Sequence, residues 1–348
     1  MPTLMEIAKR SLTLTTHHIL TLPIIVLMPH SKCNCRCVMC DIWKGNRNGQ
    51  ELSVDHISAQ LNDIRRLNPK QVVLSGGEAL MHKNLWHLCE ALRSINPDIK
   101  ITLLSTGLLL KKHAAEVVQW CDEVIVSLDG DEDTHNAIRR IPNAYQRLKE
   151  GIQALRSVDE TFQVTARCVL QQMNYAKLPQ IIDAARDLKL NQISFLGADV
   201  STDAFNRPDL WDDSRAGDVR LAPQQVTEFR EVLEHVINTY SDDFTNGFIA
   251  EDPEKLKRIV DYYAALNGDA PFPGVRCNAP WVSTVIEADG TVRPCFFQPA
   301  MGNIRENSLN HILNTQEAIE FRRQLDTTTD PICQKCVCSL HLSPRADL

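Results

Sequence analysis

The chain has 348 residues, of which 43% are hydrophobic and 23% charged, a globular composition that argues against disorder. Its formal net charge is −7 and its isoelectric point is about 5.9, which disfavours nucleic acid and anionic membranes as main partners because phosphate binding needs a basic surface. No apolar run reaches the roughly 18 to 20 residues that span a bilayer. We therefore predict a cytoplasmic protein with no membrane span, whose partner is a small molecule or another protein.

Apolar, strand-like runs alternate with segments of helical period through the first 200 residues. The strands are expected at 23–28, 71–77, 99–106, 122–130, 162–170 and 191–199. Between them the helical segments are 53–67, 84–95, 144–157 and 178–189. This alternation of strand and helix predicts an α/β fold with a parallel sheet that is covered on both sides.

The regular alternation of strand and helix ends near residue 200. A polar, loop-like segment at 201–220 precedes two amphipathic helices at 223–240 and 252–266, and a hairpin is expected at 281–297 around Asp289-Gly290. We therefore divide the chain into an N-terminal extension (1–20), a core of alternating strands and helices (21–200), a helical insertion or linker (201–274) and a small C-terminal module (275–348).

Four of the twelve cysteines crowd into the stretch CNCRCVMC, directly after the first strand. A disulfide framework belongs to small secreted domains, so clustered cysteines in a long cytoplasmic chain point to metal. Cys33, Cys37 and Cys40 have the spacing C-x3-C-x2-C, and three thiolates can hold an iron–sulfur cluster while one iron stays open for chemistry. A zinc site would need Cys35 as its fourth ligand, and such closely alternating thiols strain a tetrahedral geometry.

The tail carries a second constellation of thiols. Cys277 and Cys295 are separated by 17 residues that include the hairpin, and Cys333 and Cys336 form CQKC after a helical segment at 308–325. Four thiolates complete a closed site, and their spacing alone leaves both zinc and iron–sulfur open. The roles of Cys35 and Cys338, next to the two sites, also stay open.

The cysteine motif, together with SGGEAL at 75–80 after the second strand, resembles the radical S-adenosylmethionine (SAM) superfamily. The resemblance implies a partial (β/α)6 TIM-like barrel over residues 20–200. It also implies a [4Fe–4S] cluster on Cys33, Cys37 and Cys40 whose open iron is chelated by SAM. Gly76, Gly77 and Glu78 would form the turn that receives the amino group of SAM. One departure is Met39, where an aromatic residue is common in the family.

Weaker matches continue down the barrel. SLDG at 127–130 and THNAIRRIPNAY at 134–145 resemble SAM-side loops of the family, which implies that Ser127 and Arg139 approach the ribose or the carboxylate. Asn174, after the fifth strand, is a further candidate for binding SAM. The alternative is that these are solvated polar residues of surface loops.

The tail resembles the twitch subdomain, the shortened relative of the SPASM domain in radical SAM enzymes. This implies a small α+β domain and one auxiliary [4Fe–4S] cluster on Cys277, Cys295, Cys333 and Cys336. A full SPASM domain carries further downstream cysteines for a second cluster, and only Cys338 remains here.

In this family an electron splits SAM to methionine and a 5′-deoxyadenosyl radical, which removes a hydrogen atom from the substrate. The resemblance implies an oxidation or dehydrogenation of a polar small molecule, assisted by the auxiliary cluster, with flavodoxin or ferredoxin as electron donor. One alternative is a peptide-modifying enzyme, which is disfavoured because no fused peptide-binding domain precedes the barrel. Another is a non-catalytic metal-binding protein, against which the three loop cysteines and the Gly-Gly-Glu turn argue.

Two charged residues lie where a barrel interior should be apolar. Arg167 lies in the fifth strand and Asp199 at the end of the sixth, and a charge facing inward there is costly unless it is paired or used. We predict that they anchor a polar, hydroxyl-rich substrate, that 201–220 closes over it, and that Asp199 accepts the proton released on oxidation. The alternatives are that Arg167 points outward or that the two residues form an ion pair.

Overall fold

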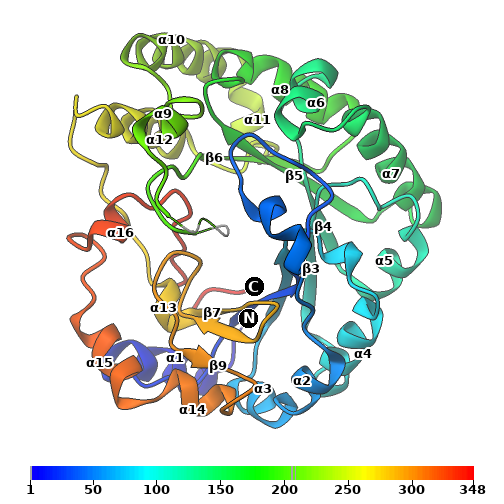
Figure 1. The fold of residues 1–348 in the computed structure, drawn as a ribbon, viewed down its shortest axis with the longest axis vertical. Helices are drawn as coiled ribbons and strands as arrows, with labels where there is room; N and C mark the ends of the chain where they lie inside the picture. Colours follow the sequence, from blue (N-terminus) through cyan, green and yellow to red (C-terminus); the bar gives the residue numbers. More distant parts are fainter. Residues whose placement is uncertain (1, 205–206, 208) are drawn as a thin grey trace.

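A sheet of parallel strands, bent into a partial barrel, is the centre of the fold (Figure 1). The computed structural model describes residues 2–204, 207 and 209–348. All six expected strands are present, each within a few residues of its expected bounds. They are β1 (Ile24–His30), β2 (Gln71–Gly76), β3 (Lys100–Ser105), β4 (Glu123–Ser127), β5 (Gln163–Leu170) and β6 (Gln192–Gly197). Each of them pairs in parallel with the next, which confirms the predicted fold class.

The strands alternate between two environments because successive side chains of a strand point to opposite faces. In β5 the even-numbered residues are buried under the covering helices, whereas the odd-numbered ones face the interior of the barrel and are partly accessible. The buried set is Val164, Ala166, Cys168 and Leu170. The interior face of β5 therefore contributes residues to the cavity inside the barrel, and Arg167 is one of them.

Helices cover the outer face of the sheet, along the outer arc of Figure 1. The expected helix at 53–67 is divided into α2 (Val54–Ser58) and α3 (Leu61–Leu67). The segment 134–145, which the sequence suggested as a loop, contains the end of a helix, α6 (Glu132–Arg139). The other covering helices are α4 (Leu85–Ile95), α5 (Ala114–Trp120), α7 (Ala144–Val158) and α8 (Leu178–Asp187).

The C-terminal part of the chain extends the same sheet. Strand β7 (Ser283–Ile286) pairs in parallel with β1, and β8 (Thr291–Arg293) and β9 (Gly302–Asn303) follow it in antiparallel order. The turn between β7 and β8 contains Gly290 at φ +89°, a left-handed conformation that suits glycine. The remaining C-terminal helices are α13 (Ala279–Val282), α14 (Leu309–Leu313), α15 (Gln316–Gln324) and α16 (Pro331–Gln334).

Helices also cover the edge of the sheet at β6. They are α9 (Asp213–Gly217), α10 (Pro223–Thr239), α11 (Ser241–Thr245) and α12 (Pro253–Leu266). Two tyrosines of α12 hold the end of β6: the amide of Ala198 donates to Oη of Tyr263 (2.8 Å), and Oη of Tyr262 donates to the carbonyl of Ala198 (3.0 Å). Helix α12 is thus tied to the strand end that precedes Asp199.

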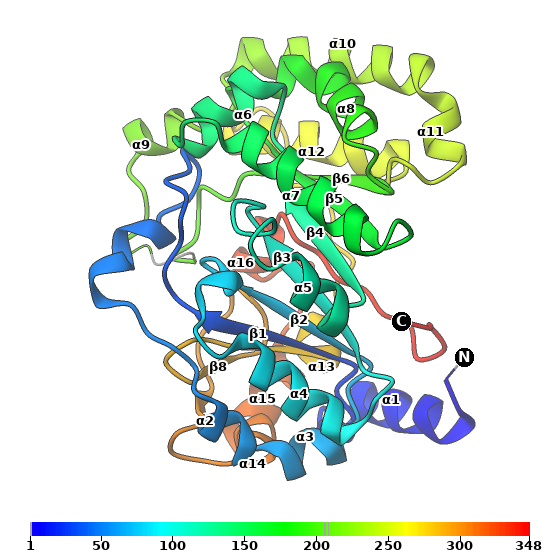
Figure 2. The same cartoon turned by 90° about the vertical axis from the view of Figure 1, so that its right-hand side faces the viewer.

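The two termini lie near each other, as Figures 1 and 2 agree. Helix α1 (Leu4–Thr16) packs beside the C-terminal segment, and Nη1 of Arg10 donates to the carbonyl of Ala346 at 2.7 Å. Among the residues that the structure describes, no helix combines the length and the apolarity needed to cross a membrane.

Candidate active site

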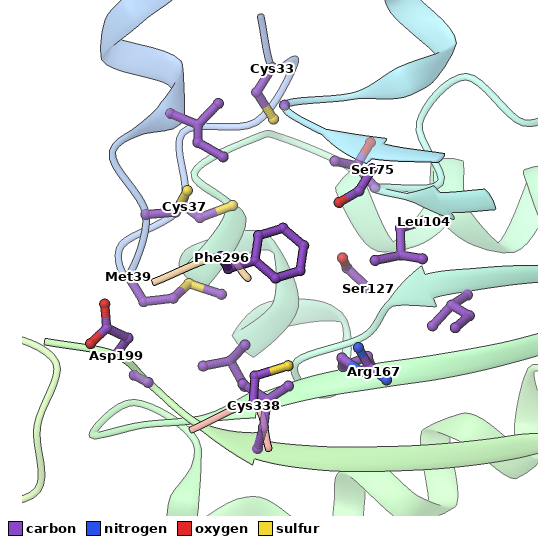
Figure 3. A pocket seen from close by; sticks show the side chains of 18 of the residues that line it. Cys33, Cys37, Met39, Ser75, Leu104, Ser127, Arg167, Asp199, Phe296 and Cys338 are labelled. Carbon is purple, nitrogen blue, oxygen red and sulfur yellow. The ribbon is translucent and has the colours of Figure 1, made fainter. Parts of the chain in front are cut away.

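A cavity of about 270 Å³ lies at the carboxyl ends of the strands, where parallel β/α folds place their chemistry (Figure 3). The cysteine loop after β1 forms one part of its wall and the ends of β2 to β6 form another. The C-terminal part of the chain contributes the third, with Phe296, Phe297, Val337 and Cys338. Residues more than 250 positions apart in the sequence therefore share one cavity.

Three of the four cysteines in the loop line this cavity. They are Cys33, Cys37 and Cys40, whereas Cys35 is only 1% exposed and packs into a small core beside Leu108 and Ala144. The thiol of Cys35 donates to that of Cys37 and lowers the pKa of Cys37 to about 7, against the effect of burial. The sequence did not assign a role to Cys35. The structure places Cys35 behind the three thiols that face the cavity.

The turn after β2 lies directly against the cysteine loop. The amide of Gly77 donates to the carbonyl of His30 (3.1 Å) and the amide of Glu78 to the carbonyl of Lys32 (2.9 Å). A Cβ on Gly77 would lie 2.1 Å from that Lys32 oxygen, and Gly76 has φ +112°. Both positions therefore require glycine, and both residues line the cavity, as a turn that receives a cofactor should.

Glu78 faces away from the cavity. Its carboxylate is 1% exposed and accepts hydrogen bonds from the backbone amides of Leu80 and Thr106 and from the hydroxyls of Ser105 and Thr106. Burial raises the pKa of Glu78, and these hydrogen bonds oppose the rise. In this arrangement Glu78 fixes the Gly-Gly turn to the end of β3, so its effect on SAM would come through positioning.

The three weaker candidates differ in their positions. Ser127 lines the cavity, and Arg139 does so as well while it donates to the Oδ2 of Asp129 at 2.6 Å and to the sulfur of Cys37 at 3.5 Å. Asn174 is buried behind the wall, where its amide nitrogen donates to the carbonyls of Asp129 (3.0 Å) and Val169 (3.1 Å). Arg139 thus joins the loop after β4 to a cluster cysteine, and Asn174 holds the loops after β4 and β5 together.

Arg167 and Asp199 both line the cavity but do not pair with each other. The Oδ2 of Asp199 accepts from Nη1 of Arg207 at 2.7 Å, and both side chains are at most 2% exposed. Thr202 also donates to Asp199, at 2.6 Å. Arg167 instead contacts Ser194, to whose Oγ its Nε donates at 3.3 Å. The suggested outward orientation of Arg167 and the suggested ion pair are therefore both wrong.

The segment after β6 is fastened to the cysteine loop. The guanidinium groups of Arg207 and Arg215 lie 3.8 Å and 4.0 Å from the ring centre of Trp211, a cation–π arrangement. The indole of Trp211 donates to Asp41 at 2.9 Å, and Arg215 donates to the carbonyl of Val38. The predicted closing segment 201–220 therefore lies beside the cavity at these described residues; residues 205, 206 and 208 lie outside the described part.

The second set of cysteines surrounds a separate cavity of about 100 Å³. It is lined by Cys277, Cys295, Cys333 and Cys336, the four predicted ligands, and also by Cys338. Within the described residues, no three His, Cys, Asp or Glu side chains converge as closely as one metal ion requires. A four-iron cluster is larger than an ion and takes one thiolate at each iron, so thiols spread around a cavity fit it.

Phe296, Phe297 and Cys338 line both cavities. A substrate in the larger cavity would therefore lie between the two sets of thiols, with these three side chains between it and the smaller cavity.

Comparison with known proteins supports the assignment. The profile of the radical SAM superfamily matches residues 27–185, and that of SPASM, an iron–sulfur cluster-binding domain, matches 277–337. The chain belongs to the radical SAM superfamily. Its cofactors are therefore SAM with a [4Fe–4S] cluster and an auxiliary cluster, and each set of thiols lies within the matching part of the chain.

Individual relatives of this radical SAM protein are distant. Fe-coproporphyrin III synthase of Methanosarcina barkeri is 23% identical over 93% of this chain and 84% of its own. The subtilosin biosynthesis protein AlbA of Bacillus subtilis is 22% identical over 82% of this chain and 58% of its own. The chain spans about half the length of other curated relatives that it matches.

Solved structures share the fold. Streptococcus suis SuiB bound to the precursor peptide SuiA has a TM-score of 0.63 at 15% identity, with 94% of this chain and 73% of SuiB covered. At this identity the likeness establishes the radical SAM fold alone.

Sequence reasoning missed several residues of the site. Asp129, the partner of Arg139, is the acid of the SLDG motif at 127–130. Its place in a motif that resembles a SAM-side loop was a signal that could have identified it as a residue of the site. No local signal marks Phe296 or Val337 as cavity residues, because their place depends on how the C-terminal part folds back across the barrel.

Proposed function

We propose that this protein is a radical SAM enzyme that oxidises or dehydrogenates a small molecule held between its two cluster sites. The observation that carries the proposal is the shared wall of the two cavities, formed by Phe296, Phe297 and Cys338. Cys277, Cys295, Cys333 and Cys336 would hold an auxiliary cluster behind this shared wall, and such a cluster would supply an acceptor for the electron that remains after hydrogen removal. This supports an oxidation more than a reaction in which the substrate regains its hydrogen.

When bound at the loop cysteines, the cluster and SAM supply the radical that removes hydrogen. The chain itself contributes position and exclusion of water. The Gly76-Gly77 turn leaves room for the amino-acid end of SAM, and Ser127 offers a hydroxyl to its ribose. Arg139 brings a cation, partnered by Asp129, to the wall beside Cys37, and the segment fastened through Trp211 closes one side.

The residues that line the larger cavity restrict the chemical class of the substrate. Because Asp199 is engaged by Arg207 and Thr202, it is not placed to bind hydroxyls or to accept a proton in this conformation. Much of the remaining wall is apolar, with Leu104, Ile125, Val169, Leu196, Phe296 and Val337. These features favour a substrate with an apolar body over the hydroxyl-rich one that the sequence suggested.

A peptide substrate is the second candidate. It is favoured by the relative AlbA, whose name assigns it to the biosynthesis of a bacteriocin, and whose match covers 82% of this chain. The hypothesis of a small-molecule substrate is favoured by the similarity to Fe-coproporphyrin III synthase, because that match extends over most of both chains.

The test is anaerobic reconstitution with iron and sulfide, reduction by dithionite, and addition of SAM, with 5′-deoxyadenosine measured by mass spectrometry. We expect slow formation of 5′-deoxyadenosine without substrate, and faster formation with fractions of small metabolites than with peptide fractions. A reconstituted protein that forms none would contradict the proposal. Stimulation by peptides alone would favour the second candidate, and flavodoxin or ferredoxin in place of dithionite tests the electron donor.

A further inference from the structure

We infer that Arg167 binds a carboxylate of the substrate, so that the substrate of this enzyme is a monoanionic acid with an apolar body. The inference rests on the proposed function, because it takes the larger cavity as the place of the substrate. It adds the chemical class of the group that the cavity recognises.

The position of Arg167 follows from the sheet. Arg167 is paired with Ser127 on β4 and with Ser194 on β6, so the three side chains lie side by side in one layer of the barrel interior. Figure 3 shows its guanidinium across the cavity from Cys33. The turn of Gly76 and Gly77, which is expected to hold the amino-acid end of SAM, lies next to the cysteine loop and not next to Arg167. The carboxylate of SAM is therefore not the expected partner of Arg167.

No acidic side chain of the described residues forms an ion pair with Arg167. Two other charged side chains line the cavity, Arg139 and Asp199, and each has a buried partner of opposite charge, Asp129 and Arg207 respectively. Across the described chain, no acid lies within ion-pair distance of Arg167. Within the described residues the Arg167 side chain makes one hydrogen bond, from Nε to Oγ of Ser194, so neither terminal nitrogen has a protein acceptor there. A cation in a partly enclosed, mostly apolar cavity is costly unless a ligand brings the opposite charge.

The single charge and the planar shape of the Arg167 guanidinium restrict the kind of anion that it can bind. One arginine balances one negative charge, and its two terminal nitrogens form a planar fork that matches the two oxygens of a carboxylate. A phosphate monoester carries more charge and would call for a second cation, and Arg139 is already neutralised by Asp129. The apolar residues around Arg167, such as Val169 and Leu196, suit the body of the acid and not its charge.

The test measures binding and needs no turnover. The reconstituted holoenzyme, saturated with SAM under anaerobic conditions, is titrated calorimetrically with pairs of an acid and its primary amide: hexanoate and hexanamide, benzoate and benzamide, indole-3-acetate and indole-3-acetamide. Phenyl phosphate is titrated as the competing anion. The variants are Arg167→Met, which removes the charge, Arg167→Lys, which removes the fork, and Arg230→Met, whose arginine is half exposed and paired with Asp261 on the surface.

We expect at least one acid to bind about tenfold more tightly than its amide in the wild type and in Arg230→Met, with the preference lost in Arg167→Met and reduced in Arg167→Lys. The affinity for SAM should be unchanged in all three variants. The inference is overturned if no acid is preferred over its amide, if the preference persists in Arg167→Met, or if phenyl phosphate binds best through Arg167. It is also overturned if Arg167→Met weakens SAM instead, since Arg167 would then belong to the SAM site.

A second measurement covers the case in which Arg167→Met does not take up its clusters. In the wild type, phenylglyoxal modifies accessible arginines, and the modified peptides are quantified by mass spectrometry. The preferred acid should protect Arg167 but not Arg230, and its amide should protect neither. Equal protection by acid and amide would refute the inference. If the protein binds acids in this way but forms no 5′-deoxyadenosine, the proposed function fails while the binding site stands.

Discussion

Arg139 and Asp129 form a buried ion pair, with 2.6 Å between Nη2 of Arg139 and Oδ2 of Asp129, directly behind the cysteine loop. Backbone hydrogen bonds also join the cysteine loop to α6, because the amides of Arg36 and Val38 donate to the carbonyls of Arg139 and Ile138 respectively. The end of α6 thus holds the loop that carries the cluster ligands, and Arg139, which also lines the cavity, joins that loop to Asp129.

The first prediction concerns this pair. Asp129→Asn leaves the charge of Arg139 buried without an acid, and we expect the free energy of unfolding to fall by about 3 kcal/mol. The matched control is Asp261→Asn, because its partner Arg230 is half exposed, and it should cost less than about 1 kcal/mol. Anaerobic denaturation in urea measures both. Equal losses in the two variants would show that the buried pair contributes no more than a surface one.

The second prediction concerns the metal content. The reconstituted wild type should bind about eight irons per chain, and the triple variant Cys33→Ala, Cys37→Ala, Cys40→Ala should retain about half. Replacing the four C-terminal ligands should remove the other half. Cys89→Ala, in the hydrophobic core, is the control and should leave the iron content unchanged. A wild type that binds zinc and little iron would refute the assignment of both sites.

The third prediction concerns Glu78. Each hydrogen-bond partner of its carboxylate acts as a donor, two of them backbone amides, so Glu78→Gln would turn an amide NH₂ toward donors. We expect the affinity for SAM to fall about tenfold as the Gly-Gly turn loosens, with iron content near that of the wild type. Equilibrium dialysis with SAM measures the first and a colorimetric assay the second. Glu90→Gln, exposed on α4, is the control; loss of iron in Glu78→Gln would mean that its role is misassigned.

The fourth prediction concerns pH. Burial, followed by the charge of Arg139, lowers the pKa of His135 from 6.5 to about 3, so the folded state keeps this histidine neutral while the unfolded chain takes up a proton as the pH falls below about 6.5. Stability is therefore lost as the pH falls from 6.5 toward 3. Between pH 7.5 and 5.5 the contribution of His135 should drop by about 1 kcal/mol.

His135→Gln tests this, because its free energy of unfolding should change less between the two pH values than that of the wild type. The variant His87→Gln, at an exposed position on α4, should keep the pH dependence of the wild type. The same pH dependence in His135→Gln as in the wild type would contradict the prediction.

The fifth prediction concerns the segment after β6. Asp199→Asn weakens the ion pair with Arg207, and we expect faster proteolytic cleavage within residues 201–215 while substrate-independent cleavage of SAM continues. Mass spectrometry of the fragments locates the cuts, and 5′-deoxyadenosine reports the second activity. Asp203→Asn, an exposed neighbour in the same segment, is the control. Unchanged cleavage in Asp199→Asn would show that the pair does not hold the segment.

Local pattern was enough to predict the six strands, because each is a short apolar run between turn residues, and the two sets of cysteines, because metal ligands cluster in short loops. The order of strand and helix was also enough for an α/β fold with a parallel sheet, whereas the partial barrel was implied by the resemblance to radical SAM enzymes. The division of the helix expected at 53–67 was not predicted, since the apolar period continues across the break between Ser58 and Leu61.

The sequence did not predict the side-chain contacts that depend on how the loops and strands pack together. Asp199 was expected to bind substrate, and its pairing with Arg207 depends on the path of a polar segment with no regular period. Glu78 belongs to a motif that points to SAM, yet its carboxylate turns toward Ser105 and Thr106, which only the packing of β3 beside β2 brings near. That Arg167 faces inward, with no acid of the described residues at ion-pair distance, likewise depends on how the whole barrel is assembled.

The pairing of β7 with β1 has a consequence for synthesis on the ribosome. Strand β1 leads into the cysteine loop and emerges early, but its second neighbour emerges only after residues 283–286 have been made. Until then β1 is an open edge, with backbone groups that can pair with another chain. A nascent or truncated chain that stops before β7 should therefore aggregate through the strand that bears the cluster loop, and iron loaded at that stage would enter a site whose far wall is still missing.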